Sequence, residues 1–141
     1  MSTSPDAIDA VRDGGTLTRT ILLVEDHDAV RNLATAILEN EGLRVLEASD
    51  GSTALERAQA YPEKIDALLT DIMLPDLNGN ELAESISAAR PGIKVLFLSG
   101  YTDDIVEEHG SFQNIRFLQK PFTPAALVQE VWQLLRRPPK G

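Results

Sequence analysis

Residues 65–75 read Ile-Asp-Ala-Leu-Leu-Thr-Asp-Ile-Met-Leu-Pro, a short apolar run that ends in an acidic residue. Runs of this kind, bounded by turn residues, are typical of strands inside a parallel sheet. Pro75 and the Asn78-Gly79 pair then predict a loop before the next helical segment. The stretch therefore predicts a buried strand that places Asp71 at its carboxyl end.

Similar strands alternate with helical segments on both sides of this stretch. Short apolar or branched runs predict further strands over 21–24, 43–48, 93–98 and 115–118. Apolar residues three and four positions apart predict helices over 30–38, 54–58, 82–89, 103–108 and 124–135. Five strands alternating with five helices predict an α/β fold, a (βα)5 doubly wound parallel sheet. Ligands of such sheets bind beyond the carboxyl ends of the strands.

Length and composition fit one domain without disulfides. The 141 residues include no cysteine and carry a formal net charge of −9, which argues against a nucleic-acid partner. We find no secretory signal and no apolar run of about 20 residues that would insert into a membrane, so we expect a cytoplasmic protein. We expect residues 1–19 to form a flexible N-terminal segment, 20–137 the domain and 138–141 a tail.

Charged and polar residues follow the predicted strands at one edge of the sheet. Glu25-Asp26 ends the first strand, Asp71 the third, Ser99 the fourth and Lys120 the fifth. Two carboxylates about 4 Å apart repel one another by about 4 kcal/mol at an effective dielectric near 20. One lysine cannot neutralise three carboxylates, so we expect a hard cation, and Mg²⁺ prefers such oxygen ligands.

These residue types suit phosphoryl transfer. A carboxylate can attack phosphorus and form an acyl phosphate, and Asp71 is the best candidate because its strand is central in the winding order. Mg²⁺, the Lys120 ammonium and the Ser99 hydroxyl would supply contacts to the phosphoryl oxygens. Glu25 and Asp26 are adjacent, which suits one direct metal ligand and one that acts through water.

The chain resembles a response regulator receiver domain from Thr20 to about Arg137. The resemblance rests on Val24-Glu25-Asp26, on Asp71-Ile72-Met73-Leu74-Pro75 with Gly79, on Ser99-Gly100 and on Lys120-Pro121-Phe122, in this order. It implies a flavodoxin-like sheet with strand order 2-1-3-4-5. It also implies a phosphoprotein of a bacterial two-component phosphorelay rather than an enzyme, and the donor would be a histidine kinase or a histidine phosphotransfer protein.

The resemblance implies roles at the metal site. Asp71 would be the phosphoacceptor, and Asp26 would bind Mg²⁺ directly while Glu25 assists. The backbone carbonyl of Met73 would be a further ligand, and Mn²⁺ would substitute for Mg²⁺. Lys120 would pair with the phosphoryl group, and its bond to Pro121 would be cis, which is plausible only before proline.

The resemblance also implies a switch. Ser99 would move toward the phosphoryl group, and Phe117 would fill the space that Ser99 leaves. Phe117 cannot donate a hydrogen bond as tyrosine would, so its inward state would rest on packing. The face formed by the helix over 103–108, the strand over 115–118 and the last helix would change shape, and it is a possible homodimer interface.

Other interpretations remain open. An aspartyl-phosphate phosphatase would also use Mg²⁺, but it needs a carboxylate where Met73 stands. A pseudo-receiver that only binds proteins usually lacks part of the acidic pocket. His27 is interpreted as a surface residue and Trp132 as partly buried. The chain is either a stand-alone regulator or the receiver of a hybrid histidine kinase. Its sequence over 96–104, together with 117–124, resembles receivers at the C-terminal end of hybrid kinases and favours the latter.

Overall fold

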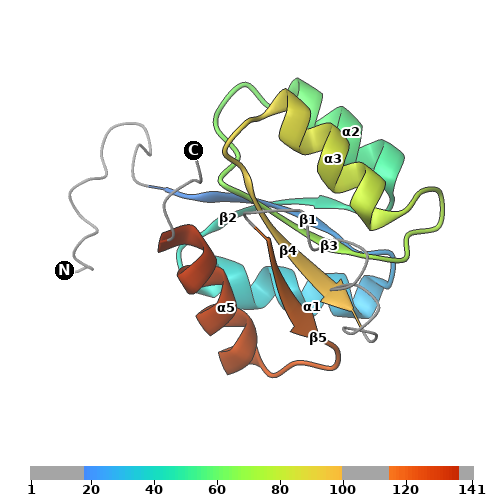
Figure 1. The fold of residues 1–141 in the computed structure, drawn as a ribbon. Coiled ribbons are helices and arrows are strands. Elements are labelled where there is room, and N and C mark those ends of the chain that lie inside the picture. Colours follow the sequence, from blue (N-terminus) through green and yellow to red (C-terminus); the bar gives the residue numbers. More distant parts are fainter. Residues whose placement is uncertain (1–17, 100–114, 137–141) are drawn as a thin grey trace.

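The computed structural model describes residues 18–99 and 115–136, which form a five-stranded parallel sheet with helices on both faces (Figure 1). The elements are β1 (Thr20–Val24), α1 (Asp28–Asn40), β2 (Arg44–Ala48), α2 (Gly51–Ala60), β3 (Ala67–Asp71), α3 (Gly79–Ala89), β4 (Lys94–Ser99), β5 (Ile115–Gln119) and α5 (Pro124–Arg136). The strand order β2-β1-β3-β4-β5 confirms the predicted sheet. The helix predicted over 103–108 lies outside the described residues.

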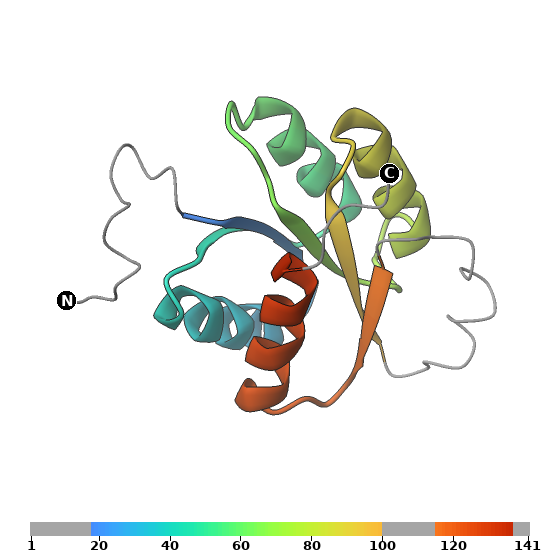
Figure 2. The ribbon, with the colours of Figure 1, turned by 60° about the vertical axis from the view of Figure 1, so that its left-hand side comes forward.

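Two apolar layers hold the helices on the sheet. α2 and α3 cover one face, and α1 and α5 cover the other (Figures 1 and 2). Along β1, Leu22 and Val24 contact the α2–α3 layer, whereas Ile21 and Leu23 contact the α1–α5 layer. All four side chains are fully buried. The central strands are therefore apolar at almost every position because both of their faces are covered.

Helix ends follow from local sequence signals. The Asp50 side chain accepts a hydrogen bond from Thr53 N, 2.8 Å away, and so caps α2. Asn78 and Glu81 form a capping box at the start of α3. Thr123 Oγ1 accepts a hydrogen bond from Ala126 N at 3.0 Å and so caps α5. In the described residues no helix combines the length and apolar character needed to cross a bilayer.

Arg90 joins the end of α3 to the end of α2. Its guanidinium donates hydrogen bonds to the carbonyls of Ala58, Tyr61 and Glu63, at 2.7 to 3.3 Å. We expect Arg90→Ala to lower the free energy of unfolding by about 2 kcal/mol, because three backbone acceptors lose a charged donor. Urea unfolding followed by circular dichroism measures this. Arg57→Ala, at an exposed position on α2, is the control, and an equal loss in both variants would contradict the expectation.

Candidate functional site

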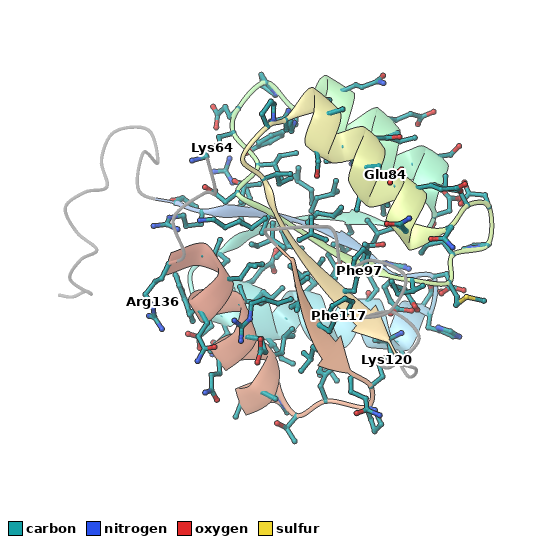
Figure 3. The ribbon with its side chains drawn as sticks, in the orientation of Figure 1. Lys64, Glu84, Phe97, Phe117, Lys120 and Arg136 are labelled. Carbon is teal, nitrogen blue, oxygen red and sulfur yellow. The ribbon has the colours of Figure 1, made fainter. Side chains whose placement is uncertain are left out.

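The carboxyl ends of three strands bring charged residues together. Asp71 is the last residue of β3, Glu25 follows β1, and Lys120 follows β5. Glu25 N donates to Ala48 O at 3.0 Å, so the pairing of β1 with β2 continues to the first acidic residue. Figure 3 labels Lys120 at the end of β5. The sheet thus sets the predicted residues at one edge, as expected for parallel strands.

Lys120 lies between two buried carboxylates. Its Nζ is 2.7 Å from Glu25 Oε1 and 2.8 Å from Asp71 Oδ2. Glu25 is fully buried and Asp71 is 8% exposed. Burial alone would lower the pKa of Lys120, but its hydrogen bonds to Asp71 and Glu25, together with their charges, outweigh this effect and raise that pKa. The ammonium therefore keeps its charge and offsets part of the repulsion between the two carboxylates.

A third carboxylate makes the edge strongly acidic. Ligand atoms of Glu25, Asp26, His27 and Asp71 all lie within 4.8 Å of one another. Asp26 Oδ1 is buried and finds no hydrogen-bond partner among the described residues, although His27 Nδ1 is 3.3 Å away. A buried carboxylate oxygen without a donor is costly unless a cation binds it. The oxygen-rich donor set fits Mg²⁺ or another hard dication.

His27 has more contacts than its sequence position indicated. The prediction that it lies at the surface is confirmed, since its side chain is 70% exposed. Its Nδ1 nevertheless lies 3.0 Å from Glu25 Oε2, and its backbone N donates to the same oxygen at 3.0 Å. The hydrogen bond with Glu25, and then the charge of Asp26, raise the pKa of His27. Sequence reasoning missed these contacts because a histidine after an acidic pair is usually only solvated.

The loop after β3 begins with contacts to Asp71. Met73 N donates to Asp71 Oδ1 at 3.1 Å, and Thr70 Oγ1 donates to the Asp71 carbonyl at 2.9 Å. Met73 pairs with Asn78 across the loop, and a Cβ on Gly79 would overlap the Asp71 carbonyl. The glycine in the motif is thus required by close backbone approach. No contact tests the predicted role of the Met73 carbonyl, which stays a prediction.

The predicted switch residues are only partly described. Phe117 is half-buried and stacks on the fully buried Phe97, with ring centroids 5.6 Å apart (Figure 3). Ser99 ends β4 opposite Gln119, but its side chain lies outside what the structure describes. The Lys120-Pro121 bond is cis, which confirms that expectation. Whether Ser99 and Phe117 move stays a prediction.

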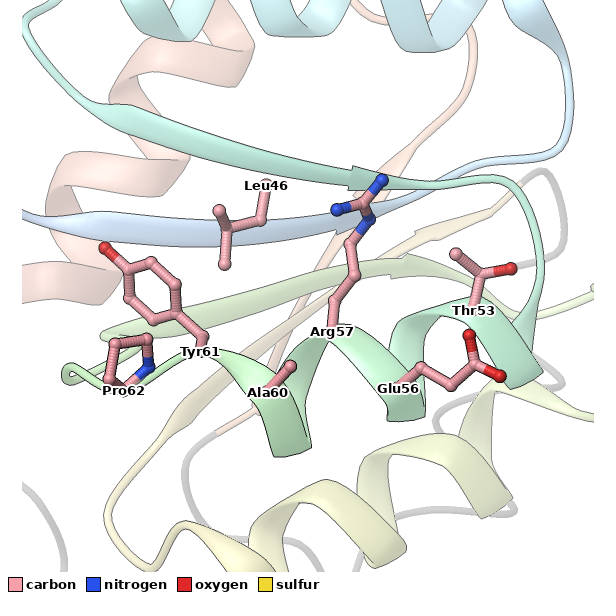
Figure 4. A pocket seen from close by; sticks show the side chains of 7 residues that line it. All are labelled: Leu46, Thr53, Glu56, Arg57, Ala60, Tyr61 and Pro62. Carbon is pink, nitrogen blue, oxygen red and sulfur yellow. The ribbon is translucent and has the colours of Figure 1, made fainter.

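An open cavity of about 410 Å³ lies elsewhere in the described part of the chain (Figure 4). It is lined by Leu46 of β2 and by Thr53, Glu56, Arg57, Ala60, Tyr61 and Pro62. None of these residues belongs to the carboxylate cluster. β2 is an edge strand, so this groove lies at the side of the sheet rather than at the strand ends. The cavity is therefore separate from the carboxylate cluster at the strand ends.

Comparison with known proteins identifies the family of this chain. The family model of the response regulator receiver domain matches residues 21–132. The response regulator receiver protein CpdR of Brucella abortus (strain 2308) is 32% identical over 118 residues, which cover 83% of this chain and 97% of CpdR. The sensor kinase CckA of the same organism is 34% identical over 119 residues, but the matched region spans only 13% of CckA.

Solved structures of receiver domains have the same fold as this chain. The crystal structure of the receiver domain from the hybrid histidine kinase CckA has a TM-score of 0.73 and 35% identity, and the match covers 83% of this chain and 99% of that domain. A response regulator receiver protein from Sinorhizobium medicae WSM419 has a TM-score of 0.76 and 28% identity, over 84% of this chain and 94% of that one. Fold, site and sequence agree: this chain belongs to the response regulator receiver domain family of two-component signalling systems.

Proposed function

We propose that Asp71 accepts a phosphoryl group from a phosphohistidine of a histidine kinase or a histidine phosphotransfer protein in the cytoplasm. The observation that carries this proposal is the meeting of Glu25, Asp26, Asp71 and Lys120 at the carboxyl edge of the sheet. Asp71 is the most suitable nucleophile because it ends a central strand and still has 8% of its surface exposed. Glu25 is fully buried and so out of reach of a partner.

The metal site would use residues that already surround Asp71. Asp26 and Asp71 would bind Mg²⁺ through carboxylate oxygens, with Glu25 assisting and the Met73 carbonyl as a further ligand. The buried Asp26 Oδ1 without a hydrogen-bond partner supports this assignment. Bound Mg²⁺ would neutralise charge on the phosphoryl oxygens, and Mn²⁺ would substitute because it accepts the same oxygen ligands.

The chain's own residues align the transfer. An Asp71 carboxylate oxygen forms the bond to phosphorus while the P–N bond of the donor breaks, and the imidazole leaves with that electron pair. Met73 N holds Asp71 Oδ1 at 3.1 Å, which orients the nucleophile. Lys120 Nζ, 2.8 Å from Asp71 Oδ2, is placed to bind an oxygen of the incoming phosphoryl group.

The phosphoryl group would act as a signal, not as an intermediate of turnover. It brings nearly two negative charges, toward which the Ser99 hydroxyl would move. Phe117, half-buried beside Phe97, would then fill the vacated space and change the face of β5 and α5. That face, with the predicted helix over 103–108, would contact a partner or a second copy of the chain.

A docking partner would meet an exposed apolar side chain close in sequence to Asp71. Among the described residues, the large hydrophobic side chains that remain exposed are Leu33, at 53%, and Met73, at 71%. Met73 lies two residues after the proposed phosphoacceptor, and Leu33 lies on the helix that begins two residues after Asp26. Met73 therefore offers an apolar contact to a protein donor that reaches Asp71.

The phosphatase alternative is less well supported. It requires an acid/base group two residues after the nucleophile, and Met73 has no proton to transfer. Small phosphate esters with poor leaving groups should therefore not turn over. Rapid turnover of phenyl phosphate, whose phenolate leaves poorly without a proton, would favour that alternative over a receiver.

The proposal predicts that the chain gains one phosphoryl mass with acetyl phosphate or phosphoramidate in the presence of Mg²⁺. Phosphoramidate carries a P–N bond like that of phosphohistidine. Intact-mass spectrometry measures the gain. Asp71→Asn should abolish it, because an amide oxygen is a poor nucleophile and forms no stable acyl phosphate.

The control is the unaltered chain with EDTA in place of Mg²⁺, which should show little or no gain. Asp71→Asn keeps one acceptor oxygen, which can serve either Met73 N or Lys120 Nζ but not both, so circular dichroism has to show that the variant is folded before the lost signal is assigned to chemistry. Equal mass gain in Asp71→Asn and the unaltered chain would contradict the proposal.

A further inference from the structure

Asp76 connects the loop after β3 to the start of α2, which lies 25 residues earlier in the chain. Its Oδ1 accepts a hydrogen bond from Gly51 N at 2.8 Å, and its Oδ2 accepts from Ser52 N at 2.9 Å. These are the first two N–H groups of α2, which lack partners within the helix. The hydrogen bonds from Ser52 and Gly51 lower the pKa of Asp76, so its carboxylate stays charged at neutral pH.

Leu77 strengthens the same junction. Its side chain packs against the α2–α3 core layer. A Cβ on Gly51 would overlap the Leu77 side chain, so the loop and the start of α2 are in close contact. A glycine at position 51 is therefore required for this approach, and the tip of the loop is held by one polar and one apolar contact.

The base of the loop is held separately. Gly79 N donates to the Ile72 carbonyl at 2.7 Å, and Met73 pairs with Asn78 across the loop. Met73 belongs to this base, and the segment that begins at its carbonyl runs through Leu74 and Pro75 to the tip at Asp76. Its backbone N binds Asp71 Oδ1, and its carbonyl is the proposed metal ligand. The loop thus has two anchors, and the carbonyl that would serve the site lies where the base passes into the segment leading to the tip.

We propose that Asp76 is a positioning residue for the metal site, because its bidentate contact with α2 holds the loop that carries the Met73 carbonyl. This inference rests on the proposed Mg²⁺ site. With the tip anchored, the segment from Met73 to Asp76 is ordered before the metal arrives. Without the anchor, metal binding has to order this segment, and the cost of that ordering lowers the affinity.

The test uses a matched pair of variants on the full chain. Asp76→Ala removes the acceptor for Gly51 N and Ser52 N, whereas Asp50→Ala removes the acceptor for Thr53 N in the same first turn of α2. Both variants lose one negative charge and one cap of the same helix. Only Asp76→Ala releases the loop.

Isothermal titration calorimetry with MgCl₂ and urea unfolding without metal give the two readouts. We expect both variants to unfold at lower urea concentration, but only Asp76→Ala to bind Mg²⁺ about tenfold more weakly, the loss seen when an outer contact of a metal site is removed. Asp76→Asn keeps one acceptor oxygen and should fall between Asp76→Ala and the unaltered chain.

Equal Mg²⁺ affinity in Asp76→Ala and Asp50→Ala would overturn the role of Asp76, because it would show that the residue only caps α2. Absence of Mg²⁺ binding by the unaltered chain would overturn the proposed metal site and this inference with it. The two failures are thus distinguishable in one set of titrations.

Discussion

Replacing Asp26 with asparagine is expected to stabilise the metal-free domain and to weaken strongly the proposed binding of magnesium. Asp26 lies within 4.8 Å of two other carboxylates, and its buried Oδ1 has no hydrogen-bond partner in the described residues. Two like charges at that separation repel by about 3 kcal/mol at an effective dielectric near 20. The variant also loses the contact of Asp26 with His27, which offsets part of the relieved repulsion. We therefore expect a net gain of about 1–2 kcal/mol in unfolding free energy.

The loss of binding should be larger than the gain in stability. Asparagine offers one neutral oxygen where Asp26 offers a charged one, and we expect the Mg²⁺ dissociation constant to rise by at least about 100-fold. Urea unfolding without metal and titration calorimetry with MgCl₂ measure the two effects. Asp28→Asn removes the same charge two residues later, at an 82% exposed side chain, and should change neither quantity much. Lower stability in Asp26→Asn would contradict the expected repulsion.

Replacing Lys120 with methionine is expected to have the opposite effect on stability. The substitution leaves the fully buried Glu25 and the nearly buried Asp71 without their shared ammonium. Breaking a buried ion pair from one side commonly costs 3–5 kcal/mol, and because the Lys120 side chain is 22% exposed we expect about 2–3 kcal/mol. Added Mg²⁺ should restore part of this loss, since it supplies positive charge to the same carboxylates.

The effect of Lys120 should not vary with pH near neutrality. The pKa of Lys120 is raised in the folded chain, so its contribution is fully present below the ordinary value of 10.5 and is lost only as pH rises through the folded value. Urea unfolding at pH 7 and pH 9 checks this. Lys64→Met is the control, because Lys64 is 84% exposed and its contact with Asp66 spans 3.6 Å. Equal losses in the two variants would contradict a special role for Lys120.

The sheet and the acidic edge could be predicted because each rests on a strong local signal. Strands covered on both faces require apolar runs, as in Ile21-Leu22-Leu23-Val24, and parallel strands carry the residues after them to one edge. Asp71, Asp26 and Lys120 each lie at the carboxyl end of such a strand, so the sequence alone predicts that they lie close together. The observed convergence confirms that part of the prediction.

Other features depend on contacts between distant segments that no local pattern reports. Asp76 reads as an ordinary loop residue, and only the folded chain shows it 2.8 Å from Gly51 N. Arg90 likewise binds carbonyls about 30 residues away. The contacts of His27 with Glu25 and Asp26 depend on how the chain turns into α1. Such contacts follow from tertiary packing, so sequence periodicity cannot predict them.

The proposed function requires that Asp71 itself takes the phosphoryl group. The most direct measurement is peptide mass mapping of the chain after acetyl phosphate and Mg²⁺ treatment, followed by borohydride, which reduces an aspartyl phosphate to homoserine. We predict homoserine at position 71 and at no other aspartate. A phosphoryl mass gain with homoserine at Asp26, or with intact Asp71 and the modification on His27 or a serine, would contradict the assignment.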